Sequence, residues 1–286
     1  MRADPSLRSR AGFISAPTVD IAFRVPPELV DPLVEVIATY SRAVPEVAAG
    51  GGGDAIVATR LPNTRSGNEK RGRIEAAARL LGRIAPIKAA RRSRRGDALR
   101  SGRFVINAGR GHKLASTDLR IRLEASKAFG TGWHPSTQLC LEAVERYVKA
   151  GTRLLDVGAG SGILSIAAAH LGAREVVALD TSLDAVRATR RSARLNGVSR
   201  RIRAVHGTMP QPGLGTFDVV VINISARVAC VLAPHARAAM TPTGVLIVAG
   251  VLDTQRVDVA TALRAAGLRT TEETRNGEWL CLTAHR

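Results

Sequence analysis

The chain has 286 residues, of which 45% are hydrophobic and 3% aromatic, and its formal net charge is +18. This length can hold one large domain and one small one. No apolar run approaches the roughly 18 residues needed to cross a bilayer, which excludes a transmembrane protein and a membrane partner. Cys140, Cys230 and Cys281 lie far apart, without disulfide or metal-site spacing. We therefore expect reduced core thiols, no metal and a cytoplasmic location.

The N-terminal part predicts a tail and a small domain. Residues 1–17 contain Arg and Ser but lack the apolar core of a secretory signal, so their composition favours a flexible tail over a transit peptide. Residues 18–61 contain two alternating segments, TVDIAFRV and DAIVATRL, and between them the helical pattern PELVDPLVEVIATYSRA. This pattern predicts a small α/β domain.

Basic residues dominate the next stretch. Between Arg60 and Lys113 there are 16 Lys or Arg residues against three acids, around one helical pattern, RIEAAARLLGRI. We expect residues 62–124 to be a basic linker region that ends in the strands FVINAG and DLRIRLEA. Such a density of charge attracts nucleic acid, so RNA contact through residues 60–113 is one interpretation. Genome composition is the other, because only five of the 42 basic residues in the chain are lysines.

Strands and helices alternate regularly after Gly151. Five short strands, RLLDVG, EVVALD, RIRAVH, FDVVVIN and GVLIVAG, are separated by segments with helical spacing. This alternation predicts a doubly wound parallel α/β sheet with helices on both faces. The final LRTTEETRNGEWLCLTAHR instead predicts two strands joined at Asn276 and Gly277. The predicted sheet thus has seven strands and ends in an antiparallel hairpin.

A glycine-rich turn follows the first of these strands. In DVGAGSGIL, Gly158, Gly160 and Gly162 stand between strand and helix, where a ligand can approach bare main chain. The dinucleotide-binding fingerprint needs its third glycine one residue later. Asp156, two residues before the first glycine, suits a cationic amino group better than a pyrophosphate. The turn therefore predicts a ligand without a diphosphate.

The second strand ends in a carboxylate, Asp180, at the position that accepts the hydroxyls of a ribose. Its alternative role is to cap the helix from Leu183, although Thr181 or Ser182 could do this instead. With the glycine turn, Asp180 indicates a nucleoside-bearing ligand, for which S-adenosylmethionine is the candidate. Thr208, after the third strand, is a candidate contact for the adenine.

Asn223 ends the strand FDVVVIN, and at that place it would project into the crevice where open α/β sheets bind ligands. Its amide carbonyl could orient an acceptor nitrogen without taking a proton. The alternative is an N-cap for the helix from Ala226.

Six segments, AFGTGWHPST, DVGAGSGIL, ALD, VVINIS, AGVL and NGEWLCL, resemble in this order the PrmA-type class I methyltransferases, which use S-adenosylmethionine to methylate protein eleven of the large ribosomal subunit. The similarity covers about residues 125–286. It implies a Rossmann-like methyltransferase domain over these residues and a substrate-recognition domain in residues 18–61. The linker and the approach to AFGTG differ from the family pattern, which leaves the substrate open.

The resemblance also implies roles for residues. The segment from Phe129 to Gly132 would close over the cofactor, so that Phe129, Gly130, Thr131 and Gly132 line its methionine end. Thr131 and Asn223 would lie near the methyl group as the catalytic pair. Asp156, Gly158, Gly160 and Gly162 would bind the methionine end. Trp133 would cover the pocket mouth or contact substrate, and His134 would be structural rather than a general base.

Three functions are compatible with these features. The leading one is methyl transfer by direct displacement to a protein amine, a Lys side chain or an N-terminus, most naturally of a ribosomal protein. The basic segment leaves open a methyltransferase that acts on RNA or a small molecule. The third is a non-catalytic binding module, against which the intact glycines, Asp156, Asp180 and Asn223 argue.

Overall fold

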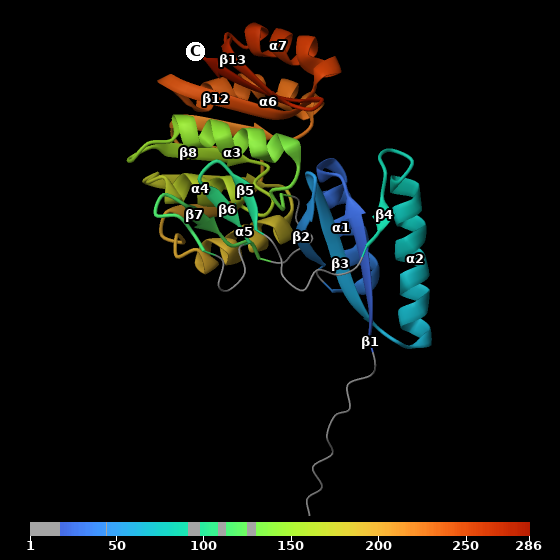
Figure 1. Cartoon of the computed structure of the whole chain (residues 1–286). Helices are drawn as coiled ribbons and strands as arrows, with labels where there is room; N and C mark the ends of the chain where they lie inside the picture. Colours follow the sequence, from blue (N-terminus) through green and yellow to red (C-terminus); the bar gives the residue numbers. More distant parts are fainter. Residues whose placement is uncertain (1–17, 44, 91–97, 108–112, 125–129) are drawn as a thin grey trace, which may run out of the picture.

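The computed structural model describes residues 18–43, 45–90, 98–107, 113–124 and 130–286. Its strands form three sheets: a four-stranded sheet near the N-terminus, a short three-stranded sheet, and a seven-stranded sheet whose strands come from the C-terminal half of the chain (Figure 1). In this part of the chain no helix is both long and apolar enough to cross a membrane.

The four-stranded sheet and two helices form the small N-terminal unit. Its strand order is β2-β3-β1-β4, with β1 antiparallel to both β3 and β4. This is the ferredoxin-like arrangement of two interleaved strand-helix-strand halves. Its elements are β1 (Thr18–Val25), the short 3₁₀ helix η1 (Pro27–Leu29), α1 (Val30–Ser41), β2 (Glu46–Gly51), β3 (Asp54–Pro62), α2 (Arg65–Leu81) and β4 (Lys88–Ala89).

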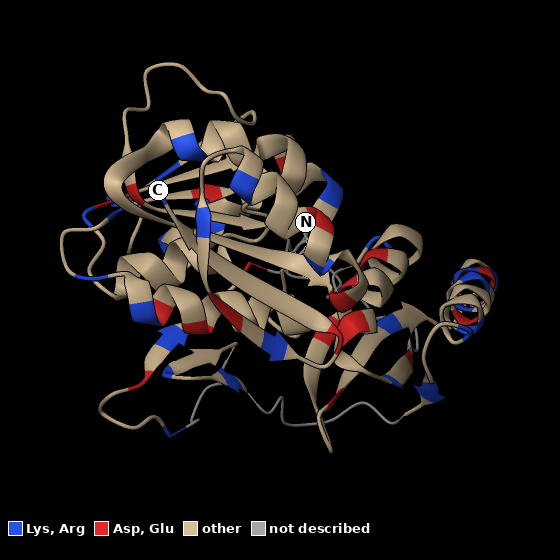
Figure 2. Cartoon of the chain, turned by 90° about the horizontal axis from the view of Figure 1, so that it is seen from above, with Lys and Arg blue, Asp and Glu red and all other residues tan. Residues whose placement is uncertain are grey.

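The stretch expected to be a basic linker, residues 62–124, is largely folded. Helix α2 begins after Thr64, whose side chain accepts a hydrogen bond from Gly67 N, and its Ile74 and Ala78 are buried in the core of the N-terminal unit. Most other α2 side chains face solvent, which is why the sequence conceals this packing. Figure 2 shows basic and acidic residues side by side on α2, where Arg71 pairs with Glu75 at 2.7 Å. Arg91, Arg92, Arg94 and Arg95 lie outside the described residues.

The rest of the expected linker supplies the three-stranded sheet β5-β6-β7. Phe104, Ile106 and Ile121 are fully buried in the same core as the first helices and strands of the large sheet. The strands are β5 (Leu99–Ser101), β6 (Phe104–Ile106) and β7 (Leu119–Ile121). The helix and strands expected within residues 62–124 are therefore present, and the domain bounds 18–61, 62–124 and 125–286 stay predictions.

The large sheet has the order β10-β9-β8-β11-β12-β14-β13. Strands β8 to β12 are parallel where they pair with one another, and β14 is antiparallel to both β12 and β13. The doubly wound seven-stranded sheet with a C-terminal hairpin is confirmed. Its strands are β8 (Arg153–Val157), β9 (Glu175–Asp180), β10 (Ile202–His206), β11 (Phe217–Asn223), β12 (Met240–Leu252), β13 (Arg269–Asn276) and β14 (Trp279–His285).

Helices cover both faces of this sheet because its central strands are apolar on both sides. Val219 and Val221 of β11 lie in one core with α3 and α4, and Val220 and Ile222 lie in a second core with α6 and α7. The helices are α3 (Pro135–Tyr147), α4 (Ile163–His170), α5 (Leu183–Leu195), α6 (Ala226–Ala239), the 3₁₀ helix η2 (Asp253–Gln255) and α7 (Arg256–Ala265). The chain order reverses between β8 and β11, so ligands are expected at the carboxyl ends of these strands.

Candidate active site

The glycine turn after β8 has a backbone that other residues rarely adopt. Gly158, Gly160 and Gly162 have φ angles of +77°, +56° and +82°. A Cβ atom on Gly158 would stand 2.5 Å from Ile224 Cγ2, and one on Gly162 would stand 2.9 Å from the Cγ2 of Thr189. Both conformation and space therefore require glycine here. The turn leads directly into α4, whose N-cap is Gly162.

Asp180 ends β9 and holds the glycine turn. Its Oδ2 accepts a hydrogen bond from Gly160 N at 2.9 Å, and its Oδ1 accepts one from Ser182 N at 2.8 Å. The cap of α5 is Ser182, whose side chain accepts a bond from Ala185 N. This excludes the helix-cap alternative for Asp180. Each carboxylate oxygen retains a further lone pair for a ligand hydroxyl.

Asn223 ends β11 beside the start of α3. Its Nδ2 donates to Thr137 Oγ1 at 3.4 Å, which leaves the amide carbonyl available to accept a bond. Ser225 stands at the N-cap of α6, so Asn223 does not cap that helix. The turn after β11 packs on Gly250, where an added Cβ would stand 2.2 Å from Ile224 O.

His134 is the N-cap of α3 and has a structural environment. Its Nδ1 accepts a bond from Ser136 N at 3.2 Å and lies 2.8 Å from Ser136 Oγ. Its ring meets that of Trp279 edge to face, with centroids 4.4 Å apart. Burial lowers the pKa of His134 to about 4, so the ring is neutral at physiological pH. The His134 ring therefore adds no charge to the site.

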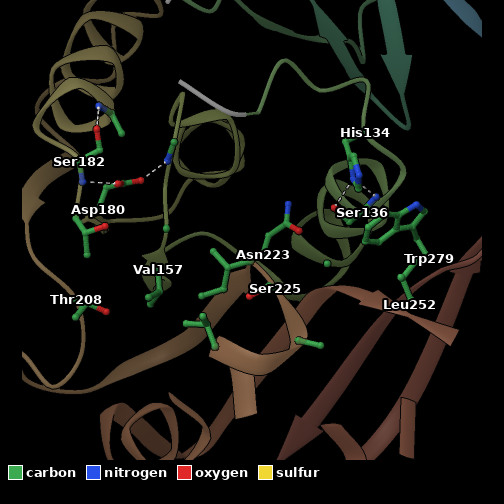
Figure 3. A pocket seen from close by; sticks show the side chains of 18 of the residues that line it. His134, Ser136, Val157, Asp180, Ser182, Thr208, Asn223, Ser225, Leu252 and Trp279 are labelled. Atoms are coloured by element: carbon green, nitrogen blue, oxygen red, sulfur yellow. Dashed lines mark hydrogen bonds between the residues drawn. The ribbon is translucent and has the colours of Figure 1, made fainter. Parts of the chain in front are cut away.

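These residues surround one cavity of about 810 Å³. In Figure 3, Asp180 and Thr208 lie at one side of it, His134 and Trp279 lie at the other, and Asn223 lies between them. Such a volume accommodates a nucleoside-sized ligand. The other lining residues are Glu35, Ser136, Val157, Gly158, Gly160, Thr181, Ser182, Ala185, Gly207, Ile224, Ser225, Ala226, Val228, Gly250, Leu252 and Gln255.

Residues 99–286 match the family model described as ribosomal protein L11 methyltransferase (PrmA). The chain belongs to the PrmA family. Curated relatives with the name ribosomal protein L11 methyltransferase include those of Pelotomaculum thermopropionicum, 39% identical over 188 residues, and Herpetosiphon aurantiacus, 39% identical over 195 residues. These alignments cover 65% and 61% of this chain, and 61% and 60% of the respective relatives. The chain thus spans about three fifths of the length of these relatives.

A solved PrmA-family structure resembles the fold. The crystal structure of ribosomal protein L11 methylase from Lactobacillus delbrueckii subsp. bulgaricus matches with a TM-score of 0.59 and 31% identity. The match covers 64% of this chain and 93% of that one. The family match begins at residue 99, earlier than the resemblance at about residue 125, and so includes the three-stranded sheet. The N-terminal unit lies outside the matched residues.

The structure brings together five of the predicted site residues. The cavity is lined by Gly158, Gly160, Asp180, Thr208 and Asn223. Four others, Gly130, Thr131, Gly132 and Gly162, are not among its lining residues, although Gly162 shapes the turn. Phe129 lies outside the described residues.

Asp156 does not face the cavity. Its side chain is only 1% exposed and accepts a bond from Ser165 Oγ at 2.6 Å, on the α4 side of the sheet. Burial raises the pKa of Asp156 to about 6, partly opposed by the bonds from Ser165. Asp156 is not among the residues that line the cavity, and its contact with the methionine end of the cofactor stays a prediction. Its place beneath the turn follows from strand alternation, because Val157 takes the opposite face.

The segment from Gly130 to Trp133 faces the N-terminal unit. Thr131 N donates to Asp31 Oδ1 of α1 at 3.1 Å. Thr131 does not line the cavity, and its place near the methyl group stays a prediction. Trp133 is buried in the core of the N-terminal unit instead of covering the pocket mouth. Gly130 O accepts a bond from Ser161 Oγ at 2.6 Å, which ties the segment to the glycine turn as well.

Sequence reasoning missed several cavity residues. Trp279 and Leu252 face each other across the antiparallel pair β14 and β12, and the NGEW motif is the signal that could have identified Trp279. The HPST motif is likewise the signal that could have identified Ser136. Glu35 comes from α1, about 100 residues before the first motif, and no local signal identifies it.

Proposed function

We propose that this chain transfers a methyl group from S-adenosylmethionine to an amine of ribosomal protein L11. The observation that carries the proposal is the convergence, at the carboxyl ends of β8, β9 and β11, of the glycine turn, Asp180 and Asn223 on one cavity. The names of the PrmA relatives supply the acceptor. The cytoplasm, where ribosomal proteins meet such enzymes, is the location that this proposal implies.

The residues fit S-adenosylmethionine. Asp180 would accept the two ribose hydroxyls, as a carboxylate at the end of the second strand does in this class of sheet. Gly158 and Gly160 would offer main chain to the methionine portion, because both have positive φ angles and a Cβ on Gly158 would also meet Ile224 Cγ2. Thr208, at the Asp180 side of the cavity, would lie nearest the adenine.

When bound, the cofactor supplies a methyl group on a positively charged sulfur. Asn223 would orient the acceptor, because its carbonyl can accept one N–H of an amine and so direct the nitrogen lone pair at the methyl carbon. The amine must be neutral to attack, so its ammonium form first releases one proton to solvent water. A C–N bond then forms as the C–S bond breaks, the electron pair stays on sulfur, and the product is a methylammonium. Neutral His134 would help to enclose the site without taking that proton.

The N-terminal unit is proposed as the part that recognises the protein substrate. It lies outside the family match, and its α1 reaches the candidate site through Glu35 and Asp31. RNA contact through residues 60–113 stays a prediction. Both acids of α2 pair with arginines, Arg65 with Glu69 at 3.5 Å and Arg71 with Glu75 at 2.7 Å.

The test is transfer of a labelled methyl group from S-adenosylmethionine to purified, unmethylated ribosomal protein L11. We expect label in the protein that resists base hydrolysis, as N-methyl groups do, and an initial rate of labelling about a hundredfold lower with Asn223→Ala. A parallel reaction with total ribosomal RNA and small-molecule extract checks the alternatives. Label only in RNA or a small molecule would replace the proposed acceptor. No label in any fraction would favour the binding module.

A further inference from the structure

Helix α1 of the N-terminal unit contributes one residue, Glu35, to the edge of the candidate site. Glu35 is the only cavity-lining residue among those described before residue 99, and all the others come from 134–279. Its side chain is exposed, so it lies at the open edge of the cavity rather than in its interior. The cavity mouth is thus shared between the N-terminal unit and the methyltransferase fold.

Two contacts hold α1 in this place. Asp31, one helical turn before Glu35, is 5% exposed and accepts the bond from Thr131 N at 3.1 Å. Residues four apart lie on the same face of a helix, so the face that meets Thr131 also presents Glu35. Trp133, two residues after Thr131, is buried among side chains of the N-terminal unit such as Phe23. These contacts fix the position of α1, and with it the backbone of Glu35, beside the cavity.

The charge of the cavity is negative. Its lining includes two carboxylates, Asp180 and Glu35, and no Lys or Arg from the described chain. Asp180 already accepts two main-chain N–H groups, whereas no hydrogen bond or ion pair joins Glu35 to any residue that the structure describes. In a chain of net charge +18, an unpaired acid at the mouth of a cavity selects for a cation.

We propose that Glu35 is a specificity-determining residue that recognises the methyl acceptor as a cationic amine, a lysine ammonium or an N-terminal ammonium. This inference rests on the proposed function and deepens it. The α-ammonium of the cofactor has the same chemistry, but it would lie inside the cavity beside the glycine turn, whereas Glu35 lies at the exposed edge. Asp31 acts as a positioning residue through its bond to Thr131.

The first experiment compares Glu35→Gln, which removes the charge and keeps the shape, with Glu28→Gln, a matched change in the same unit away from the cavity. For Glu35→Gln we expect the KM for ribosomal protein L11 to rise about tenfold, with kcat and the Kd for S-adenosylmethionine within about twofold of wild type. Glu28→Gln should change none of these. An unchanged KM would overturn the proposal, and so would a cofactor Kd that rises as much as the KM, because Glu35 would then bind the cofactor.

A second experiment needs no turnover. N-acetyl-lysine amide and its neutral analogue N-acetyl-norleucine amide are titrated into enzyme saturated with S-adenosylhomocysteine. We expect wild type and Glu28→Gln to prefer the lysine derivative, and Glu35→Gln to lose this preference. A preference that survives Glu35→Gln, or its absence in wild type, contradicts the proposal. Because this measurement is independent of methyl transfer, its failure is distinguishable from failure of the proposed function.

Discussion

Gly160 N donates a hydrogen bond to Asp180 Oδ2 over 2.9 Å, which joins the glycine turn to the end of the neighbouring strand. Asp180→Ala removes this bond and both proposed ribose contacts. We expect the Kd for S-adenosylmethionine to rise about a hundredfold by isothermal titration calorimetry, because bonds to a charged group contribute about 1.5–3 kcal/mol each.

The matched control for Asp180 is Asp184→Ala. Asp184 is an exposed acid in the first turn of α5 that pairs with Arg187 at 3.1 Å and does not line the cavity. The Asp184→Ala variant should bind S-adenosylmethionine with the affinity of wild type. An Asp180→Ala enzyme with unaltered affinity would remove the ribose assignment.

Asn223 should affect turnover more than binding. Asn223→Ala loses the carbonyl that orients the acceptor amine but leaves the glycine turn and Asp180 intact. We expect kcat to fall by about a hundredfold, within the range that mispositioning of reacting atoms produces, and the cofactor Kd to change little. Steady-state kinetics with titration of the cofactor measures both. A rise in the cofactor Kd with unchanged kcat would place Asn223 in cofactor binding only.

The raised pKa of the buried Asp156 carboxyl predicts that the stability of the fold depends on pH. Burial raises its pKa from 3.8 to about 6, so between these values the folded state binds more protons than the unfolded state. The free energy of unfolding therefore falls as pH rises from about 4 to 6, by up to about 3 kcal/mol, and this contribution is constant above that window.

The test of this pH dependence is urea denaturation of wild type and Asp156→Asn at pH 4, 5, 6 and 8. Asparagine keeps an acceptor for Ser165 Oγ but cannot ionise, so the variant should gain stability relative to wild type as pH rises. The direction of this difference is the result to check. A constant difference between the two proteins across the series would show that Asp156 is not perturbed.

The general form of the site could be predicted from the sequence because its signals are local. The strand-helix alternation, the turn at Asn276 and Gly277, and the glycines after β8 each depend on residues within a few positions, and the structure contains all of them. Asp180 and Asn223 follow because the carboxyl ends of parallel strands share one edge of the sheet.

The features that could not be predicted from the sequence depend on contacts between residues far apart in the chain. Thr131 bonds to Asp31, 100 residues earlier in the chain, and no pattern within AFGTGWHPST indicates that partner. The sequence predicts a helical pattern within α2 but not its packing, because the buried side of the helix is narrow and depends on Ile74 and Ala78. Asp156 is a different case. Strand alternation puts it on the face opposite Val157, so the face was predictable, but its cover by Ser165 was not.

Gly158 and Gly151 are glycines for different physical reasons. Both have positive φ, +77° and +87°, but an added Cβ at Gly151 has no atom within 4 Å, whereas at Gly158 it would stand 2.5 Å from Ile224 Cγ2. Gly151→Ala should cost about 1–2 kcal/mol of unfolding free energy, the left-handed penalty alone. Gly158→Ala should cost more and also weaken cofactor binding. Equal stability losses with unchanged affinity would show that Ile224 moves aside freely.

Trp133 should couple the two parts of the molecule, because it lies in the AFGTGW segment but is buried, 7% exposed, in the core of the N-terminal unit. Trp133→Ala removes a large buried side chain, which costs about 3–5 kcal/mol. Hydrogen exchange should show faster exchange in β1 and α1 and unchanged protection in β8 and β11, since the large sheet has its own two cores. Trp133→Phe, which refills part of the space, should restore much of the protection. Equal loss of protection in both sheets would mean that Trp133 stabilises the whole chain rather than the contact of the N-terminal unit with the candidate site.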